Sequence, residues 1–404
     1  MSIGVITVGA IAMVVLAVFF VISSPKIPQG QQPMTVIGFV ALLFTAGLDG
    51  GLIFLPLQDF KAMKLAQWPA FVSFHPLAVE FAFWGPLVWL SYFVATAYFC
   101  FLEPRLGLFN KPAVKCIHGV LILTTAAFTL SLFWQYLPAY LPETLTSKTT
   151  GNVNERGNSW LEVLLIFTVI VTAVAASFSI KYITKLSQVS MYLFGMIMFL
   201  LLAIASPNLN QFTDLAEGLT DFFANAYGFI TPLNDYHAFY LAWWFSWSIM
   251  MGQFMAKFVA SMSIARLFVV MMFMPCLPIL GWLAACYLFV ENASNMPEWL
   301  SIALVVIAAL FVINSLDFMI NRYAENLSVN IERLGRKQYL SLHTVLLLIV
   351  TILFYQQVML IEWIGAFVIT ILILAILIGL TDRYVLKKGY INELIRKVEL
   401  IKLR

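Results

Sequence analysis

The chain consists mainly of apolar runs separated by short polar segments, and most of these runs are about 20 residues long. A helix of that length crosses the hydrocarbon core of a bilayer. The pattern predicts eleven spans, at residues 3–23, 34–56, 76–101, 113–137, 160–182, 188–205, 237–258, 264–291, 298–321, 341–360 and 362–382. We therefore expect an all-α polytopic membrane protein.

Composition agrees with this class. Hydrophobic residues make up 62% of the chain and charged residues 11%, with a mean hydropathy of +0.92. A soluble domain of 404 residues needs a more charged surface. The four cysteines are scattered without paired spacing, so we expect neither a disulfide framework nor a metal site. No nucleophile or metal-ligand constellation suggests an enzyme or a resident cofactor.

Basic residues are distributed unevenly between alternate loops. Of the 23 Lys and Arg residues, only Lys61, Lys64, Lys148 and Arg156 fall on one side. The positive-inside rule then places the N-terminus outside and the C-terminus in the cytoplasm of a plasma (inner) membrane. The basic, amphipathic tail is expected to rest on an anionic leaflet.

Two segments on the expected outer side are long. Residues 138–159 are polar and predict a loop. Residues 206–236 place Asp214, Glu217 and Asp221 among apolar side chains, which predicts a helix lying on the outer surface.

The stretch 239–254 reads FYLAWWFSWSIMMGQF and contains three tryptophans in five positions. Helical spacing puts Trp243 and Trp247 on one face, with Trp244 beside them. Electron-rich ring faces inside a membrane protein can hold a desolvated quaternary ammonium. The alternative is an aromatic belt at the lipid headgroups or simple packing, which is the more frequent use of this spacing.

The second span contains Gly47, Gly50 and Gly51 around an acidic residue, Asp49. Each glycine weakens a helix by about 1 kcal/mol relative to alanine. Broken helices at membrane depth coordinate ions and substrates in secondary transporters. Close helix packing on glycine faces is the alternative. Asp49 favours function, because a carboxylate in the bilayer usually marks an ion or proton path.

Other spans also contain polar residues. Thr125 and Thr129 lie one turn apart, where hydroxyls either ligate sodium or bond back to their own helix. Asn314, Ser315 and Asp317 either join helices together or complete a site with the second span.

Three more polar residues, Glu80, His118 and Lys257, lie near the ends of spans. Snorkelling or a local ion pair is the expected explanation for each.

Several of these segments resemble the betaine/choline/carnitine transporter family. Residues 239–254 resemble its signature, approximately F-Y-W-A-W-W-I-S-W-S-P-F-V-G-x-F. Residues 44–47 resemble its F-A-A-G, 84–92 its W-G-x-H-x-W-x-x-Y, and 314–317 its T-S-A-D. The pair at 125 and 129 resembles a threonine pair of one family sodium site.

The resemblance implies a LeuT-like fold of two inverted five-helix repeats. Residues 1–33 would hold one extra helix, where the family has two, and 34–205 and 237–382 would form the repeats. The outer helix at 206–236 would lie between the repeats, and 383–404 would be the cytoplasmic tail.

The resemblance also implies site residues. The solute would contact Trp243, Trp244, Trp247, Tyr240, Gly47, Asp49, Trp84, Trp89 and Tyr92. A coupling ion, sodium or a proton, would be bound through Thr45, Leu48, Phe311, Asn314, Ser315, Thr125 and Thr129.

This chain departs from the family pattern at several of these positions. Leu87 replaces the family histidine, Asn314 replaces a threonine, and the Glu-Pro that follows the broken helix is missing. Asp49 stands within that helix, and an aspartate at a different position of the same helix accompanies proton coupling in choline carriers of the family.

Two functions remain open. The first is a secondary transporter of a small cationic or zwitterionic solute such as betaine, choline or carnitine. The second is a transport-inactive structural or receptor subunit of a larger membrane complex. The partners are the lipid bilayer and either copies of the chain in a homo-trimer or other subunits in a hetero-complex. No nucleic acid is expected.

Overall fold

The computed structural model describes residues 2–23, 30–48, 50–141, 160–178, 180–293 and 296–402, and this part of the chain is helical, without a β-strand. The α-helices are α1 (Ser2–Ser23), α2 (Val36–Gly47), α3 (Gly51–Lys64), α4 (Pro76–Trp84), α5 (Pro86–Phe101), α6 (Glu103–Leu106), α7 (Pro112–Tyr140), α8 (Trp160–Ala176), α9 (Ile180–Ala205), α10 (Leu209–Asn225), α11 (Asp235–Met255), α12 (Ile264–Phe273), α13 (Cys276–Asn292), α14 (Glu298–Asn326), α15 (Ile331–Tyr355) and α16 (Ile361–Lys402). Short 3₁₀ turns are η1 (Pro69–Phe71), η2 (Leu108–Asn110) and η3 (Gly228–Ile230).

Within the described residues, eight helical stretches are long and apolar enough to cross a membrane. They are Ile3–Ile22, Pro76–Phe101, Pro112–Tyr140, Gln188–Ala205, Ile264–Asn292, Glu298–Asn326, Ile331–Tyr355 and Ile361–Thr381. The all-α, polytopic class expected from the sequence is confirmed.

The sequence predicted eleven spans, and three of these are absent from the eight stretches above, each for a local reason. The second expected span is divided into α2 and α3, of 12 and 14 residues, neither of which spans alone. The fifth becomes α8, which has only 17 residues. The seventh, α11, has 21 residues, but its tryptophans, tyrosines and serines lower its hydropathy.

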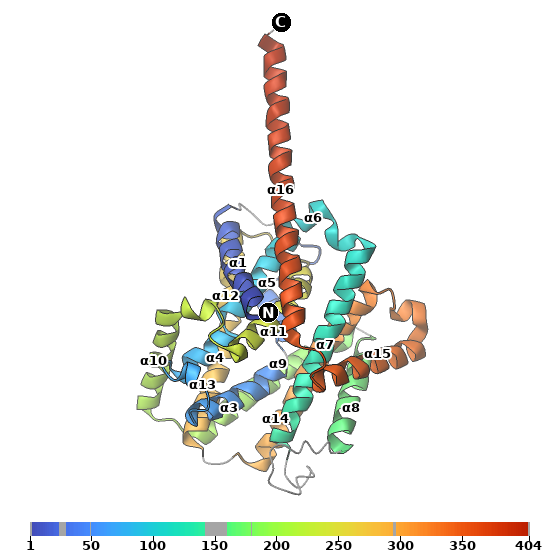
Figure 1. Cartoon of the computed structure of the whole chain (residues 1–404). Helices are drawn as coiled ribbons and strands as arrows, with labels where there is room; N and C mark the ends of the chain where they lie inside the picture. Colours follow the sequence, from blue (N-terminus) through green and yellow to red (C-terminus); the bar gives the residue numbers. More distant parts are fainter. Residues whose placement is uncertain are drawn as a thin grey trace.

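Helix α11 lies at the centre of the molecule and packs against α5 and α16 (Figure 1). Two glycines allow these close contacts. A Cβ on Gly252 would collide with Ala95 of α5, and a Cβ on Gly365 of α16 would collide with the backbone of Ala242. The three helices therefore meet backbone to backbone.

Helix α16 leaves the bundle at its C-terminal end, and its last turns project beyond the other helices (Figure 1). The expected basic tail, 383–404, forms the end of this helix up to Lys402. Its side chains lie outside what the structure describes.

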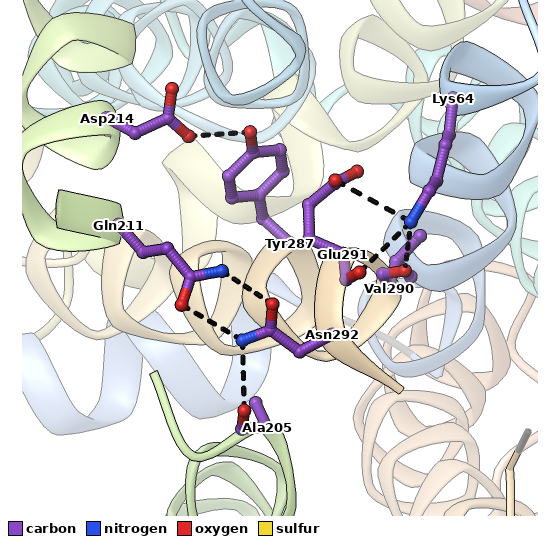
Figure 2. Close-up of polar contacts among 8 residues, drawn as sticks. All are labelled: Lys64, Ala205, Gln211, Asp214, Tyr287, Val290, Glu291 and Asn292. Carbon is purple, nitrogen blue, oxygen red and sulfur yellow. Dashed lines mark hydrogen bonds and ion pairs between the residues drawn. The ribbon is translucent and has the colours of Figure 1, made fainter. Parts of the chain in front are cut away.

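Surface helix α10 begins with a capping box, in which Asn208 and Gln211 each satisfy the other's backbone N–H. A polar clasp then joins α10 to α13 (Figure 2). In it, Tyr287 donates a 2.7 Å hydrogen bond to Asp214, and the side-chain amides of Gln211 and Asn292 bond to each other. Asn292 also donates to the Ala205 carbonyl at the end of α9.

The C-terminus of α13 is bound from the other side by Lys64 (Figure 2). Its ammonium donates to the carbonyls of Val290 and Glu291 at 2.9 and 3.1 Å and lies 3.5 Å from the Glu291 carboxylate. A cation at a helix C-terminus satisfies the free carbonyls and the negative end of the helix dipole. This contact and the α10 clasp together link α3, α9, α10 and α13.

Candidate substrate and ion site

The predicted break in the second span is present. Helix α2 ends at Gly47, and Leu48 follows in an extended conformation (φ −124°, ψ 152°) before α3 begins at Gly51. A Cβ on Gly50 would lie 2.7 Å from the Cγ2 of Val312, so α14 packs directly against the break. Glycine is needed here for close approach.

The first turns of α3 carry carbonyls that the helix does not satisfy. Pro56 has no N–H to donate to the Leu52 carbonyl, four residues before it. The indole of Trp282 in α13 donates a 2.6 Å hydrogen bond to that carbonyl, and Tyr140 of α7 donates to the Phe54 carbonyl at 2.5 Å. Neighbouring helices thus hold the broken segment in place.

Two expected site residues cannot be located in full. Asp49 lies outside the described residues, and nothing is described of the Thr45 side chain.

The break is joined to α14 through oxygen atoms. The Ser315 hydroxyl lies 2.9 Å from the Leu48 carbonyl oxygen and 3.0 Å from the Phe311 carbonyl oxygen, and it donates to both. Asn314 is buried beside it at 4% exposure. Sodium prefers a set of oxygen donors of this kind. The structure therefore brings together three of the expected ion ligands, Leu48, Phe311 and Ser315.

The threonine pair lies on α7. Both Thr125 and Thr129 are buried, and Thr125 donates a 2.9 Å hydrogen bond to the Leu121 carbonyl of its own helix. The alternative reading, a bond back to the helix, therefore describes Thr125 in this structure.

The tryptophans of α11 face the protein interior. Trp243 and Trp244 stack with centroids 4.7 Å apart, and Trp84 of α4 meets them edge-on at 5.7 and 5.2 Å. Tyr240 lies edge-on to Trp84 at 5.6 Å. All four side chains are at most 1% exposed, so the aromatic-belt alternative is wrong for them. We call Trp84, Tyr240, Trp243 and Trp244 the Trp84 ring group.

A second set of rings surrounds the end of α2. Trp89 and Tyr92 of α5 are perpendicular, with centroids 5.6 Å apart. A Cβ on Gly47 would lie 3.2 Å from Trp89, 3.3 Å from Tyr92 and 3.4 Å from Met251. The Tyr92 hydroxyl also donates a weak 3.4 Å hydrogen bond to the Gly47 carbonyl. We call Trp89 and Tyr92 the Gly47 ring group.

Along α11, Trp247 lies between Trp243 of the first ring group and Met251, which is close to Gly47. It lies one helical turn from Trp243 and one from Met251, on the same face. The indole N–H groups of Trp84, Trp89, Trp243 and Trp247 are buried and have no hydrogen-bond partner among the described residues. A buried donor without an acceptor costs about 1–3 kcal/mol.

An acidic pair that the sequence analysis did not predict as a pair lies next to the Trp84 ring group. Asp59 of α3 accepts hydrogen bonds from Tyr236 and Tyr240, both at 2.8 Å. Glu80 of α4 is 0% exposed and forms no ion pair within the described chain. The expectation that Glu80 snorkels or is paired was wrong, because α4 turns this residue toward the protein interior. Tyr236 and Tyr240 are four residues apart and therefore share one helix face, and this spacing was the sequence signal for a common hydrogen-bond partner.

Comparisons with known proteins show a partial similarity to one transporter family. A model of the "BCCT, betaine/carnitine/choline family transporter" family matches residues 143–288. The "Glycine betaine transporter OpuD" of Bacillus subtilis (strain 168) is 25% identical over 289 residues, which cover 63% of this chain and 55% of that protein. Over these parts of its length the chain is similar to the betaine/carnitine/choline transporter family. The expectation that it is not an enzyme is supported by the same match.

The family match includes all helices from α8 to α12 and most of α13. It therefore contains the tryptophans of α11 but neither the break between α2 and α3 nor Ser315. The chain spans about half the length of the betaine/carnitine/choline relative that it matches. The link between the break, the rings and α14 is thus a finding of this structure.

Proposed function

We propose that this chain is a secondary active transporter of a quaternary-ammonium solute of the betaine, choline or carnitine kind. The observation that carries the proposal is the position of the break between rings and oxygens. Gly47 contacts Trp89 and Tyr92 on one side, while the next carbonyl, that of Leu48, accepts the hydroxyl of Ser315. A solute site and an ion site would therefore share one short stretch of backbone.

The chemistry of the lining favours a methylated ammonium. Ring faces attract a cation without a hydrogen bond, each by about 2 kcal/mol or more once water is excluded. A trimethylammonium group has no N–H to donate, so ring faces suit it better than carbonyls do. The unpartnered indole donors of Trp89, Trp243 and Trp247 favour a solute that also carries an acceptor, such as a carboxylate. Betaine and carnitine have both groups.

The coupling ion would act through α14. Sodium bound by the Leu48 and Phe311 carbonyls, Ser315 and Asn314 would hold the break against this helix. The ion would then stabilise the conformer in which Gly47 meets its rings, which is how an ion gradient drives uptake. Thr125 and Thr129 are proposed for a second ion. Thr45 and Asp49 are proposed to line the same break, with a proton as the other coupling ion.

The finer architecture forms part of the proposal. We propose inverted repeats at 34–205 and 237–382, each beginning with the helix that carries site residues, α2 and α11. The helix at 1–33 is extra, and 206–236 lies on the outer side. The N-terminus lies outside and the 383–404 tail is cytoplasmic in the plasma (inner) membrane, with the chain in a homo-trimer or a hetero-complex.

Reconstitution into liposomes tests the proposal. Uptake of labelled betaine, choline and carnitine should be measured under a sodium gradient, a proton gradient and solute exchange. Uptake of at least one solute under at least one condition supports transport. Folded, reconstituted protein that moves none of the three under any condition contradicts it and favours the structural-subunit alternative.

A further inference from the structure

A pair of carboxyl groups is enclosed between α3, α4 and α11. Asp59 is 2% exposed and Glu80 is 0% exposed. They lie on the contacting helices α3 and α4, and Tyr240, which donates to Asp59, packs edge-on against Trp84, one helical turn from Glu80. Neither belongs to the proposed solute or ion ligands, and no ion pair among the described residues involves either.

The two members of the pair have different surroundings. Each oxygen of Asp59 accepts a tyrosine hydroxyl, Oδ1 from Tyr236 and Oδ2 from Tyr240. Two donated hydrogen bonds stabilise a carboxylate in its ionised form. Asp59 is therefore arranged to carry the negative charge.

Glu80 has the opposite environment. Neither of its oxygens has a hydrogen bond of ordinary geometry within the described structure, although the Asp59 carboxyl and the indole N–H of Trp84 are both close enough to interact with it. The Trp84 N–H is itself buried and unpartnered. A fully buried carboxyl without donors or a cation is far more stable when neutral than when ionised.

Among the described residues, the other titratable groups that interact with the pair do not supply a positive charge. Tyr136 of α7 and Cys286 of α13 interact with Glu80, as do Tyr236 and Tyr240 of α11. His237 follows Tyr236 in α11 and is also buried. It interacts with neither carboxyl. Two ionised carboxylates at this place would therefore repel each other without compensation.

We propose that Asp59 and Glu80 form a proton-binding site, in which Glu80 holds one proton and shares it with the Asp59 carboxylate. Two adjacent carboxyl groups that cannot both be ionised can hold a single proton between them. A metal cation fits less well, because a hard cation needs six or more oxygens and both Asp59 oxygens already accept tyrosines. Release is a simple dissociation, in which the Glu80 O–H bond breaks and the proton passes to water.

The position of the pair gives the proton a role in transport, and this step rests on the proposed function. Glu80 lies one helical turn from Trp84 on α4, and Tyr240 belongs to the same ring group while holding Asp59. Loss of the proton would make the two carboxylates repel and move α4 away from α3. The Trp84 ring group would then change together with the protonation state.

Infrared spectroscopy of the purified protein tests proton binding without requiring transport. A protonated carboxyl has a C=O stretch that shifts in heavy water, whereas a carboxylate lacks it. We expect E80Q to lose one component of this band at neutral pH. The matched control is E103Q, because Glu103 is also a buried glutamate but accepts hydrogen bonds from Tyr98 and the Phe109 N–H, both at 2.7 Å. It should leave the band unchanged.

An unchanged band in E80Q, in protein whose helix content matches wild type, would overturn the proposal. D59N provides a second variant, because an amide partner cannot carry the negative charge. We expect the remaining Glu80 component to shift in frequency in D59N. A Glu80 band that is insensitive to D59N would also contradict a shared proton.

Transport in liposomes tests the coupling separately. A gradient of one pH unit supports about tenfold accumulation when one proton moves with each solute. We expect wild-type protein to accumulate solute in response to the pH gradient. We expect E80Q to exchange solute but not to accumulate it in response to that gradient. Wild-type uptake that ignores the proton gradient refutes the coupling role alone. Absence of all uptake in wild type refutes the proposed function, while the infrared result still decides whether the pair binds a proton.

Discussion

The Ser315 hydroxyl on α14 lies 2.9 Å from the carbonyl oxygen of Leu48, in the break between α2 and α3. The two residues are 267 positions apart in the sequence. This hydrogen bond is the direct polar link between the broken segment and the helix that carries the expected ion ligands. Removing this hydrogen bond should weaken ion binding more than it destabilises the fold.

We expect Ser315→Ala to weaken sodium binding about 5- to 10-fold, because it removes one ligand and one hydrogen bond worth about 1 kcal/mol. Thermal stabilisation by sodium is the measurement, since an ion that binds the folded state stabilises it by RT ln(1 + [Na⁺]/Kd). Ser248→Ala is the control, because the buried Ser248 hydroxyl donates only to Phe245 of its own helix. Equal sodium responses in both variants would argue against an ion at this position.

Trp243→Phe keeps an aromatic ring but loses the larger face and the indole N–H. We expect betaine binding to weaken about 5- to 30-fold, in line with a loss of about 1–2 kcal/mol of cation–π and hydrogen-bond energy. Isothermal titration calorimetry measures it.

The control for this substitution is Trp134→Phe. Trp134 is also buried with an unpartnered N–H, but it stacks on Tyr355 at 4.3 Å, away from the ring groups. Its binding constant should stay within about twofold of wild type. A similar loss in both variants would indicate a general packing effect and not a solute contact.

Gly252→Ala should destabilise the protein, because the new methyl would collide with Ala95 where α5 and α11 meet. Overpacking of this kind costs about 1–3 kcal/mol. Gly195→Ala on α9 is matched, since no heavy atom lies within 4 Å of the added Cβ. It should be neutral or stabilising by up to about 1 kcal/mol. Thermal unfolding in detergent compares them, and equal unfolding temperatures would contradict the close packing.

Tyr287→Phe removes the hydrogen bond that joins α13 to Asp214 in the α10 clasp. A partly exposed hydrogen bond contributes about 0.5–1.5 kcal/mol, so amide exchange across α10 should speed up about 2- to 10-fold. Hydrogen–deuterium exchange with mass spectrometry measures this. Tyr227→Phe, at a tyrosine that is 78% exposed, should leave exchange unchanged. Unaltered protection of α10 in Tyr287→Phe would show that other contacts hold the helix.

The parts of the fold that depend on local sequence could be predicted well. The apolar runs specify helices near 76–101, 298–326 and 361–381, and the glycines at 47, 50 and 51 place the break between α2 and α3. The expected span at 237–258 is present as α11 although its hydropathy is low, whereas the expected span at 160–182 forms the shorter helix α8 of 17 residues.

The candidate site could be predicted only in part. Ser315 and Leu48 were expected together, and they are joined. Glu80 was misread, because a carboxylate near the end of an apolar run usually reaches water, and only the packing of α4 against α3, α10 and α13 encloses it.

The sequence by itself determined that this is a helical membrane protein with a broken second span and an aromatic stretch at 239–254, since hydropathy, helical spacing and glycine content are properties of neighbouring residues. Only the tertiary structure decided which distant groups meet. Asp59 and Tyr240 are 181 positions apart and share a hydrogen bond because α3 and α11 bring them to the same buried place. No pattern within either helix encodes that meeting, because it depends on how all the helices between them pack.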